Sequence, residues 1–407
     1  MQIDIGTVKG FQDFLPPESL KREAVQKVIE RYFKLYGFLP IETPVIEFDE
    51  LMKPDVLESE DAAVSDRFRL KDRAGRNLGL RYEFTFQLSR IFKQNPNIKL
   101  PFRRYQIGQV FRDEPTGAER FRQFTQCDAD IIGDSSVQAD AECLALFSSI
   151  LKELKIAAEI QVNNRKLLNA IIESVEIKNQ KEVMKELDKK EKIGEDMVKL
   201  NLKKYADSNQ IMTLFKLFEK DLKFFIDNAF DGAKELQELQ LRCRKYGLNI
   251  KFNPYMIRGL SYYTGNIFEI IQPGKGSLAG GGRYDKSVGK YSGKEIPAVG
   301  ISFGFERVVQ LANIEIETTK TIIISLKQDN ETIKLTKKLR ESGISCLPSF
   351  EKVGKALEFA NALQIKYAIF IGEDEIKKGK YKLRDMCLGT EKFLTEKQIL
   401  AELAENK

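Results

Sequence analysis

Two neighbouring segments with alternating polar and apolar residues place the strongest constraint on the fold. Residues 102–112 (FRRYQIGQVFR) and 120–132 (RFRQFTQCDADII) have the two-residue period of β-strands, and a proline and a glycine lie between them. We therefore expect an antiparallel hairpin. One face of its second strand carries Gln126, Asp128 and Asp130, and the other carries Cys127, Ala129 and Ile131. A polar row backed by an apolar face predicts a pocket floor that rests on a core.

Other segments have the pattern of single elements. Residues 17–36 show the three- and four-residue spacing of apolar side chains that predicts an amphipathic helix, and Gly37 follows it. A second helix is expected at 138–155. The run GFLPIETPVIE (37–47) contains two prolines, which favour an edge strand or a boundary because proline cannot donate a hydrogen bond to a sheet.

The chain is long enough for several domains, because 407 residues exceed what one hydrophobic core usually organises. Residues 1–164 and 251–319 are expected to be two parts of one domain, the first with the hairpin and two helices and the second with strands and glycine-rich turns. Residues 165–250, rich in Lys, Glu and Leu, predict a helical insertion between them. Residues 320–407 begin with a β-α-β-α-β order, which predicts a small α/β domain with a parallel sheet. The expected fold class is α/β: an α+β domain on a mostly antiparallel sheet, a helical insertion and a C-terminal α/β domain.

Composition excludes several kinds of chemistry. The chain contains no histidine, so a Ser-His-Asp triad, a Cys-His pair and an imidazole metal site are all impossible. Its five cysteines form no C-x-x-C, which indicates neither a zinc site nor a disulfide framework. The net charge of +6 permits a polyanionic partner without requiring one. We expect a cytoplasmic protein without membrane contact, because there is no long apolar run and no basic leader.

Three glycine-containing segments could bind a ligand or could be ordinary turns. RGLSYYTG (258–265) places an arginine and two tyrosines on a loop, and AGGGRYD (279–285) would allow close approach of a ligand or of another strand. GISFG (300–304) fits the G-x-S-x-G pattern of hydrolases, but without histidine Ser302 has no ordinary base. Arg307 would lie in the first turn of the following helix, where it could bind a phosphate or simply be solvated.

Taken in order, these segments resemble the class II aminoacyl-tRNA synthetases, and specifically the histidyl-tRNA synthetase family. The matching segments are GFQDFLP (10–16), GFLPIETPVIE (37–47), LRYEFT (80–85), FRDE (111–114) with RFRQFTQCDAD (120–130), RGLSYYTGNIFE (258–269), AGGGRYD (279–285) and GISFGFER (300–307). The resemblance covers nearly the whole chain. It implies a class II catalytic domain, a C-terminal anticodon-binding domain and a homodimer with Pro44 at its interface.

The resemblance also implies roles for individual residues. Arg112 and Arg258 would be catalytic. Histidine would be bound by Glu83, Thr85, Arg112, Gln126, Asp130, Arg258, Tyr262 and Tyr263. ATP would be bound by Arg112, Glu114, Phe124 and Arg307. Mg²⁺ is expected to accompany ATP, and no residue is assigned to it. In this interpretation the protein is a ligase that forms histidyl-adenylate and transfers histidine to the 3′ end of tRNA(His).

The chain departs from the family pattern at three positions. Ser261 replaces the usual aspartate of RGLDYY, Asp130 is one methylene shorter than the glutamate of bacterial enzymes, and Tyr82 stands where many members have proline. The alternative interpretation is a non-catalytic, synthetase-like regulatory subunit of histidine biosynthesis. Such proteins tend to lack the C-terminal domain and parts of the signature segments, whereas this chain keeps both.

Overall fold

The computed structural model describes residues 5–52, 66–117, 120–257, 262–316 and 318–405. The chain forms two compact units, residues 1–314 and 315–407, and each is described by itself. The predicted C-terminal domain begins at residue 320, close to this division. No helix in the described ranges is long and apolar enough to cross a membrane.

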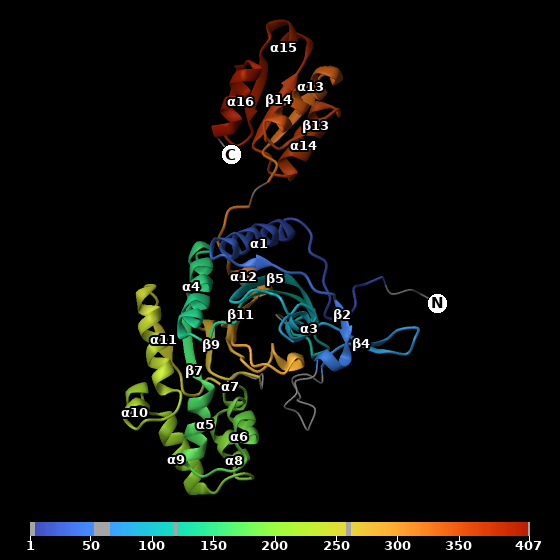
Figure 1. Ribbon diagram of the computed structural model, residues 1–407. Helices are drawn as coiled ribbons and strands as arrows, with labels where there is room; N and C mark the ends of the chain where they lie inside the picture. Colours follow the sequence, from blue (N-terminus) through green and yellow to red (C-terminus); the bar gives the residue numbers. More distant parts are fainter. Residues whose placement is uncertain (1–4, 53–65, 118–119, 258–261, 317, 406–407) are drawn as a thin grey trace. The chain divides into compact units, whose positions relative to one another are not determined.

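The larger unit is built on an eight-stranded sheet with the order β1-β5-β6-β11-β10-β9-β7-β8 (Figure 1). Its strands are β1 (Leu39–Pro40), β5 (Phe102–Phe111), β6 (Gln123–Ile132), β7 (Glu159–Asn164), β8 (Ile250–Phe252), β9 (Asn266–Gln272), β10 (Gly276–Arg283) and β11 (Ala298–Gly304). All neighbours pair antiparallel except β1 with β5 and β8 with β7, which form the two edges. The prediction of a mostly antiparallel sheet is confirmed, as is an edge position for the proline-containing run.

The predicted hairpin forms two neighbouring strands of this sheet, next to the β1 edge. Strands β5 and β6 pair antiparallel along their whole length, and Arg104 lies opposite Asp130. The second strand begins at Gln123 rather than at residue 120, so the connecting loop is longer than expected. Cys127, Ala129 and Ile131 are buried in the main core, which confirms the predicted division of the strand into two faces.

Two helices cover the apolar face of the sheet. Helix α1 (Glu18–Leu35) and helix α4 (Val137–Glu153) match the predicted helices within a few residues and contact each other (Figure 1). Phe147 of α4 stacks on Phe303 of β11 with ring centroids 4.2 Å apart, and Phe33 of α1 packs against Phe147. Buried aromatic pairs of this kind make a rigid support for the opposite, polar face.

A small three-stranded sheet and three short helical elements lie beside the main sheet in the larger unit. Strand β4 (Asn77–Leu80) pairs antiparallel with β2 (Ile46–Phe48) and with β3 (Arg69–Lys71). The 3-10 helix η1 (Asp49–Met52) follows β2, and helix α3 (Phe86–Gln94) follows β4. A second 3-10 helix, η2 (Lys290–Ser292), contacts α3.

Residues between β7 and β8 form helices, as predicted, at the β7 end of the sheet (Figure 1). They are α5 (Arg165–Ser174), α6 (Gln180–Leu187), α7 (Lys190–Ile193), α8 (Glu195–Leu202), α9 (Ser208–Phe218), α10 (Leu222–Asp227) and α11 (Ala233–Lys245). Because β7 and β8 pair with each other, the chain leaves and re-enters the sheet at the same edge. The apolar faces of these helices are continuous with the main core. The division of the larger unit at residues 164 and 250 stays a prediction.

The smaller unit contains the predicted β-α-β-α-β order. It consists of β12 (Thr321–Ser325), α13 (Asp329–Glu341), β13 (Cys346–Ser349), α14 (Val353–Ala362) and β14 (Tyr367–Ile371), and the three strands are parallel. The expectation of a purely parallel sheet is wrong. After α15 (Glu373–Lys378), strands β15 (Tyr381–Asp385) and β16 (Glu391–Leu394) extend the sheet antiparallel, and α16 (Glu396–Glu405) ends the unit. The sequence does not predict these two strands, because their residues are partly or mostly exposed and show no clear alternation of apolar and polar side chains.

Candidate active site

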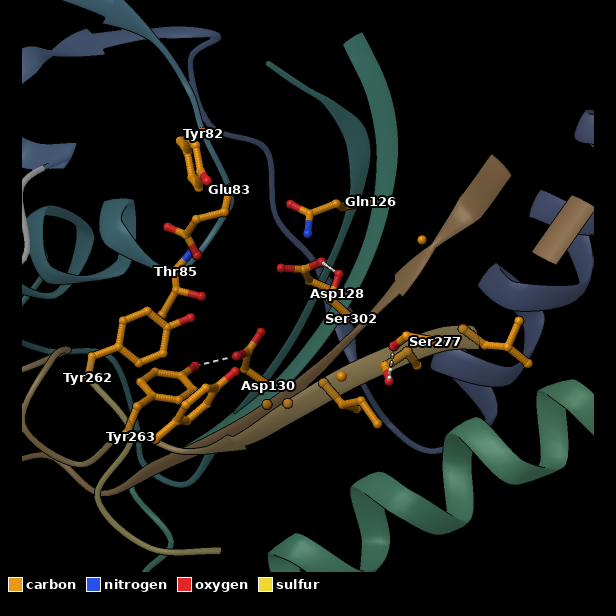
Figure 2. Close-up of a pocket in the computed structure, with 18 of the residues that line it drawn as sticks. Tyr82, Glu83, Thr85, Gln126, Asp128, Asp130, Tyr262, Tyr263, Ser277 and Ser302 are labelled. Carbon is orange, nitrogen blue, oxygen red and sulfur yellow. Dashed lines mark hydrogen bonds between the residues drawn. The ribbon is translucent and has the colours of Figure 1, made fainter. Parts of the chain in front are cut away.

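A cavity of about 390 Å³ lies over the polar face of β6 in the larger unit. Its lining includes Tyr82, Glu83, Thr85, Arg112, Phe124, Gln126, Asp128, Asp130, Tyr262, Tyr263, Tyr284 and Ser302, together with residues 277–281, Gly300, Ile301 and Gly304. Figure 2 shows Glu83 and Thr85 on one side, Gln126 and Asp128 across from them, and Asp130 near Tyr262 and Tyr263. Eight of the predicted site residues therefore line one cavity, although they come from distant parts of the chain.

Asp130 is held from two sides at one end of the floor. Its Oδ2 lies 2.6 Å from Nη2 of Arg104 on β5, and the Tyr284 hydroxyl donates a hydrogen bond to its Oδ1. Burial raises the pKa of the Asp130 carboxyl, and the Arg104 cation and the Tyr284 hydrogen bond oppose that rise. Arg104 and Tyr284 are not among the predicted site residues. Only strand pairing and the packing of the chain bring them to this carboxylate.

Asp128 is a second acid on the floor that the sequence-based assignment omits. It lies between Gln126 and Asp130 on the same strand face, and the Ser302 hydroxyl donates a hydrogen bond to its Oδ1. Burial raises the pKa of Asp128 to about 8, and the neighbouring Asp130 charge adds to the rise. The polar alternation of β6 already places Asp128 on this face, so the signal was present in the sequence.

The G-x-S-x-G segment serves this floor rather than a nucleophile. Ser302 lies inside β11, two residues before the strand ends, and its hydroxyl is bound to Asp128. A Cβ atom at Gly300 would overlap the carboxylate of Asp130, so only glycine leaves room for that side chain. The structure thus explains both the serine and the first glycine of this segment without a hydrolase function.

Glu83 and Thr85 form the wall opposite the floor. The Glu83 carboxylate accepts hydrogen bonds from the backbone N–H of Thr85 at 2.6 Å and of Phe86 at 2.5 Å, at the start of α3. This arrangement fixes the carboxylate at a helix N-terminus, where a negative charge is stabilised. Burial nevertheless raises the pKa of Glu83, with these hydrogen bonds opposing the rise.

Arg112 lies at the other end of the cavity, between two aromatic rings. Its guanidinium carbon is 4.3 Å from the centre of the Tyr82 ring and 5.0 Å from that of Phe124. Its Nε also donates to the carbonyl oxygen of Tyr82 at 3.4 Å. Glu114 is not part of the cavity lining. It lies beside it, since it accepts a hydrogen bond from the hydroxyl of the lining residue Tyr82 at 3.4 Å, and it also pairs with Arg120.

The helix after β11 begins where predicted. Helix α12 spans Phe305–Leu311, and Arg307 in its first turn donates from Nη1 to the Ser277 carbonyl at 2.6 Å. Ser277 lines the cavity, so Arg307 lies next to it. Glu306 has a different task. It accepts from the backbone N–H of Thr125 and from Arg22, each at 3.0 Å, and so joins α12 to β6 and α1.

The two predicted glycine-rich signatures contribute in different ways. Tyr262 and Tyr263 pack against each other with ring centroids 4.9 Å apart, and Tyr262 contacts Tyr284 at 5.8 Å. Arg258 and Ser261 lie outside the described residues. Arg283 of AGGGRYD points away from the cavity and pairs with Asp140 at the start of α4. It is therefore a structural residue, whereas the neighbouring Tyr284 faces Asp130.

The cavity has two electrostatically distinct ends. Glu83, Asp128 and Asp130 make one end acidic, which suits a ligand with positively charged and N–H donor groups. Arg112, with Arg307 close by, makes the other end suitable for an anion, and the rings of Tyr82 and Phe124 can stack on a flat group. Among the described residues, no three potential acidic or cysteine ligands gather as a metal site.

An antiparallel sheet that carries these motifs around such a cavity defines a class II aminoacyl-tRNA synthetase. A family model for histidyl-tRNA synthetase matches residues 10–308, and a model for an anticodon binding domain matches residues 320–406. The chain belongs to the histidyl-tRNA synthetase family.

Similarity to individual proteins extends along the whole chain. It is 37% identical to histidine–tRNA ligase 1 of Bacillus cereus, covering 96% of this chain and 95% of that protein. It is 34% identical to histidine–tRNA ligase 2 of Shouchella clausii, covering 96% and 98%. The crystal structure of histidyl-tRNA synthetase from Nostoc sp. PCC 7120 matches with a TM-score of 0.87 at 28% identity, covering all of both chains.

One structural neighbour bears on the alternative interpretation. An ATP phosphoribosyltransferase regulatory subunit/histidyl-tRNA synthetase from Bacillus halodurans matches with a TM-score of 0.77 over 91% of this chain and 99% of that one. Its identity of 21% shows a shared fold alone. The full-length similarity to ligases favours the enzyme over a regulatory subunit.

Proposed function

We propose that this chain is a histidine–tRNA ligase that activates L-histidine with ATP and transfers it to the 3′ end of tRNA(His). The observation that carries this proposal is the single cavity with an acidic end and an arginine end, in a chain that matches histidine–tRNA ligases over its length. Histidine has an ammonium group and an imidazole N–H for the acidic end, and its carboxylate would reach toward the arginines and ATP.

The histidine site consists of residues from both sides of the cavity. Glu83, Thr85 and Gln126 would receive the α-ammonium group, because their oxygens face one another across the cavity (Figure 2). Asp130 would accept a hydrogen bond from the imidazole N–H, with Tyr262 and Tyr263 packed around the ring. A site built on an acceptor rejects amino acids that lack a donor at that position, since the buried carboxylate would then be left unpaired.

The ATP site lies at the arginine end. Phe124 would stack on the adenine, Glu114 would accept from its amino group, and Arg307 would bind the distal phosphates. Arg112 would contact both the α-phosphate and the substrate carboxylate, which matches its position between the rings of Tyr82 and Phe124. Arg258 is proposed as a second catalytic cation on sequence grounds. Mg²⁺ typically binds such sites through phosphates and waters and would add positive charge there.

Adenylate formation needs no base from the protein. A carboxylate oxygen of histidine attacks the α-phosphorus of ATP, the bond to the β-phosphate oxygen breaks, and pyrophosphate leaves. The nucleophile is already an anion, and the negative charge that grows on the phosphoryl oxygens is what Arg112 would stabilise. A chain without histidine can therefore catalyse adenylate formation. Transfer to the tRNA hydroxyl then releases AMP.

The smaller unit would bind the anticodon of the tRNA, consistent with the family model that matches it. We also propose a cytoplasmic location, where tRNA charging supplies translation. A homodimer is supported by an apolar face on the small sheet. Ile46 and Phe48 of β2 and Leu70 of β3 are 48%, 47% and 40% exposed, and both Phe48 and Leu70 pair with Leu78. Exposed apolar side chains gathered on one sheet face indicate an interface.

The test is ATP–pyrophosphate exchange with each of the twenty amino acids, followed by charging of tRNA(His). Exchange with histidine alone, and charging of that tRNA, is the expected result. Histidine binding without exchange would overturn the proposal in favour of a regulatory subunit. Exchange with a different amino acid would leave the reaction class intact and refute the substrate.

A further inference from the structure

Arg104 is a fully buried cation directly beneath the amino-acid end of the cavity. It lies on β5 opposite Asp130 on β6, its exposed fraction is 0%, and it does not line the cavity. An arginine in such a position must act through its neighbours rather than by touching a ligand. The sequence motifs assign it no role, because it precedes the family segment FRDE by several residues.

The contacts of Arg104 join the two walls of the histidine site. Its Nη2 lies 2.6 Å from Oδ2 of Asp130 on the floor. The same nitrogen donates at 3.3 Å to the carbonyl oxygen of Phe84, which lies between Glu83 and Thr85 on the opposite wall. One guanidinium therefore fixes the distance between the carboxylate proposed for imidazole and the segment proposed for the α-ammonium group.

Among the described residues, the titratable groups that face Arg104 at this end of the cavity are all acids. Asp128 and Asp130 come from β6, Glu83 from the segment before α3, and Tyr284 from the residue after β10. Three carboxyl groups thus lie around one buried cation. Without that cation, mutual repulsion and burial would both favour protonation of Asp130, and a protonated carboxyl offers a weaker acceptor to an imidazole N–H.

The cost of burying Arg104 indicates a role beyond packing. Its Nε and Nη1 have no hydrogen-bond partner within the described part of the chain. Buried donors without partners are unfavourable, and neutral residues of similar size often replace a buried ion pair without loss of stability. The guanidinium is therefore best explained by what it does to Asp130 and to the 83–85 segment.

We propose that Arg104 is a positioning residue for the amino-acid substrate, holding Asp130 as an oriented carboxylate and linking it to the Glu83–Thr85 wall. This inference rests on the proposed function, because it assumes that Asp130 receives the imidazole ring. It adds a residue outside the cavity lining to the determinants of histidine recognition.

The experiment compares Arg104→Met and Arg104→Lys with the matched control Arg103→Met in ATP–pyrophosphate exchange from pH 6 to 9. Arg103 is the neighbouring residue on β5, and it points to the other face, where it pairs with Glu142 at 2.7 Å. Arg104→Met is expected to raise the histidine KM about tenfold or more at pH 7, and the ATP KM less than about twofold. The ratio of the variant's histidine KM to that of the parent should be smaller at pH 9 than at pH 6, because higher pH favours the ionised form of Asp130. Arg104→Lys should restore part of the loss.

A double-mutant cycle separates positioning from a general structural effect. In the Asp130→Asn background, Arg104→Met should raise the histidine KM by less than about twofold further, because the carboxylate it supports is gone. The double variant removes both members of the Arg104–Asp130 pair, so it remains informative if Arg104→Met alone fails to fold. Thermal unfolding of each variant reports whether it is folded.

Several results would overturn the inference. Equal increases in the histidine and ATP KM values would do so, as would an effect matched by Arg103→Met or an undiminished effect in the Asp130→Asn background. Failure of the proposed function shows itself differently, as a parent chain that does not exchange with histidine. If the parent exchanges normally with histidine but the Arg104 variants do not show the expected changes in KM, the proposed function stands and only the role of Arg104 is refuted.

Discussion

Gly300 and Asp130 face each other on paired strands, and a side chain at Gly300 would occupy the position of the Asp130 carboxylate. The glycine of one motif thus makes room for the acid of another motif, about 170 residues earlier in the chain. If Asp130 receives the imidazole ring as proposed, recognition of histidine depends on this complementarity as well as on the acid itself. It leads directly to a first prediction.

Gly300→Ala should impair histidine binding although it removes no functional group. The new methyl group would displace the Asp130 carboxylate, so we expect the histidine KM to rise about tenfold and stability to fall by about 1–3 kcal/mol, as for other overpacked sites. Gly354→Ala is the control, because nothing lies within 4 Å of its added Cβ. Steady-state exchange and thermal unfolding measure both effects, and an unchanged KM would show that the carboxylate can move without penalty.

Arg307→Ala should affect ATP more than histidine. Loss of a two-pronged donor to the distal phosphates is expected to raise the ATP KM by about tenfold and the histidine KM by less than about twofold. Arg31→Ala removes an exposed arginine that pairs with Glu153 and should change neither value. Pyrophosphate exchange at varied ATP provides the measurement. A larger effect on histidine than on ATP would exclude a phosphate role for Arg307.

At alkaline pH, Asp128→Asn should be more stable to unfolding than the parent protein. The folded-state pKa of Asp128 is about 8, against an ordinary value of 3.8, so between these values the folded chain keeps a proton that the unfolded chain releases. The contribution of this group to the free energy of unfolding therefore falls as pH rises, by at most about 1.4 kcal/mol per pH unit. It stops falling above pH 8, where the carboxyl is ionised in both states. The variant lacks this penalty, so its advantage over the parent should grow from pH 5 to pH 8.5.

Urea unfolding of parent and variant at several pH values tests this trend. Asp72→Asn is a control of opposite sign, because hydrogen bonds from Arg76 lower the pKa of Asp72, and that group stays ionised from pH 5 to 8.5 in both states. Its stability difference from the parent should be constant over that range. A constant difference for Asp128→Asn as well would mean that Asp128 is ionised in the folded protein at neutral pH.

Charge on the exposed face of the small sheet should weaken the proposed dimer. Phe48→Glu and Leu70→Glu each place a carboxylate among apolar side chains that a second copy would bury, so we expect a shift from dimer to monomer at micromolar concentration. Leu388→Glu, at a residue that is 76% exposed in the smaller unit, should leave the dimer intact. Sedimentation velocity distinguishes the two species. A parent chain that is monomeric throughout would refute the dimer itself.

Much of the fold followed from local patterns. The alternation in 123–132 was sufficient to assign the polar floor and the apolar support, because successive residues of a strand point to opposite faces whatever the strand pairs with. Helix α1 and the first three strands of the smaller unit were equally accessible from periodicity. Strands β15 and β16 were missed because their partly exposed residues show too little apolar alternation.

The candidate site, too, could be predicted only in part from the sequence. The sequence by itself determined that Gln126, Asp128 and Asp130 share a face, and its ordered motifs identified the family. Only the tertiary structure showed that Arg104 and Tyr284 hold Asp130, that Ser302 binds Asp128, and that Gly300 leaves space for a carboxylate. Those relationships depend on the register between strands far apart in the chain, which is decided by the packing of the whole sheet and not by any local pattern.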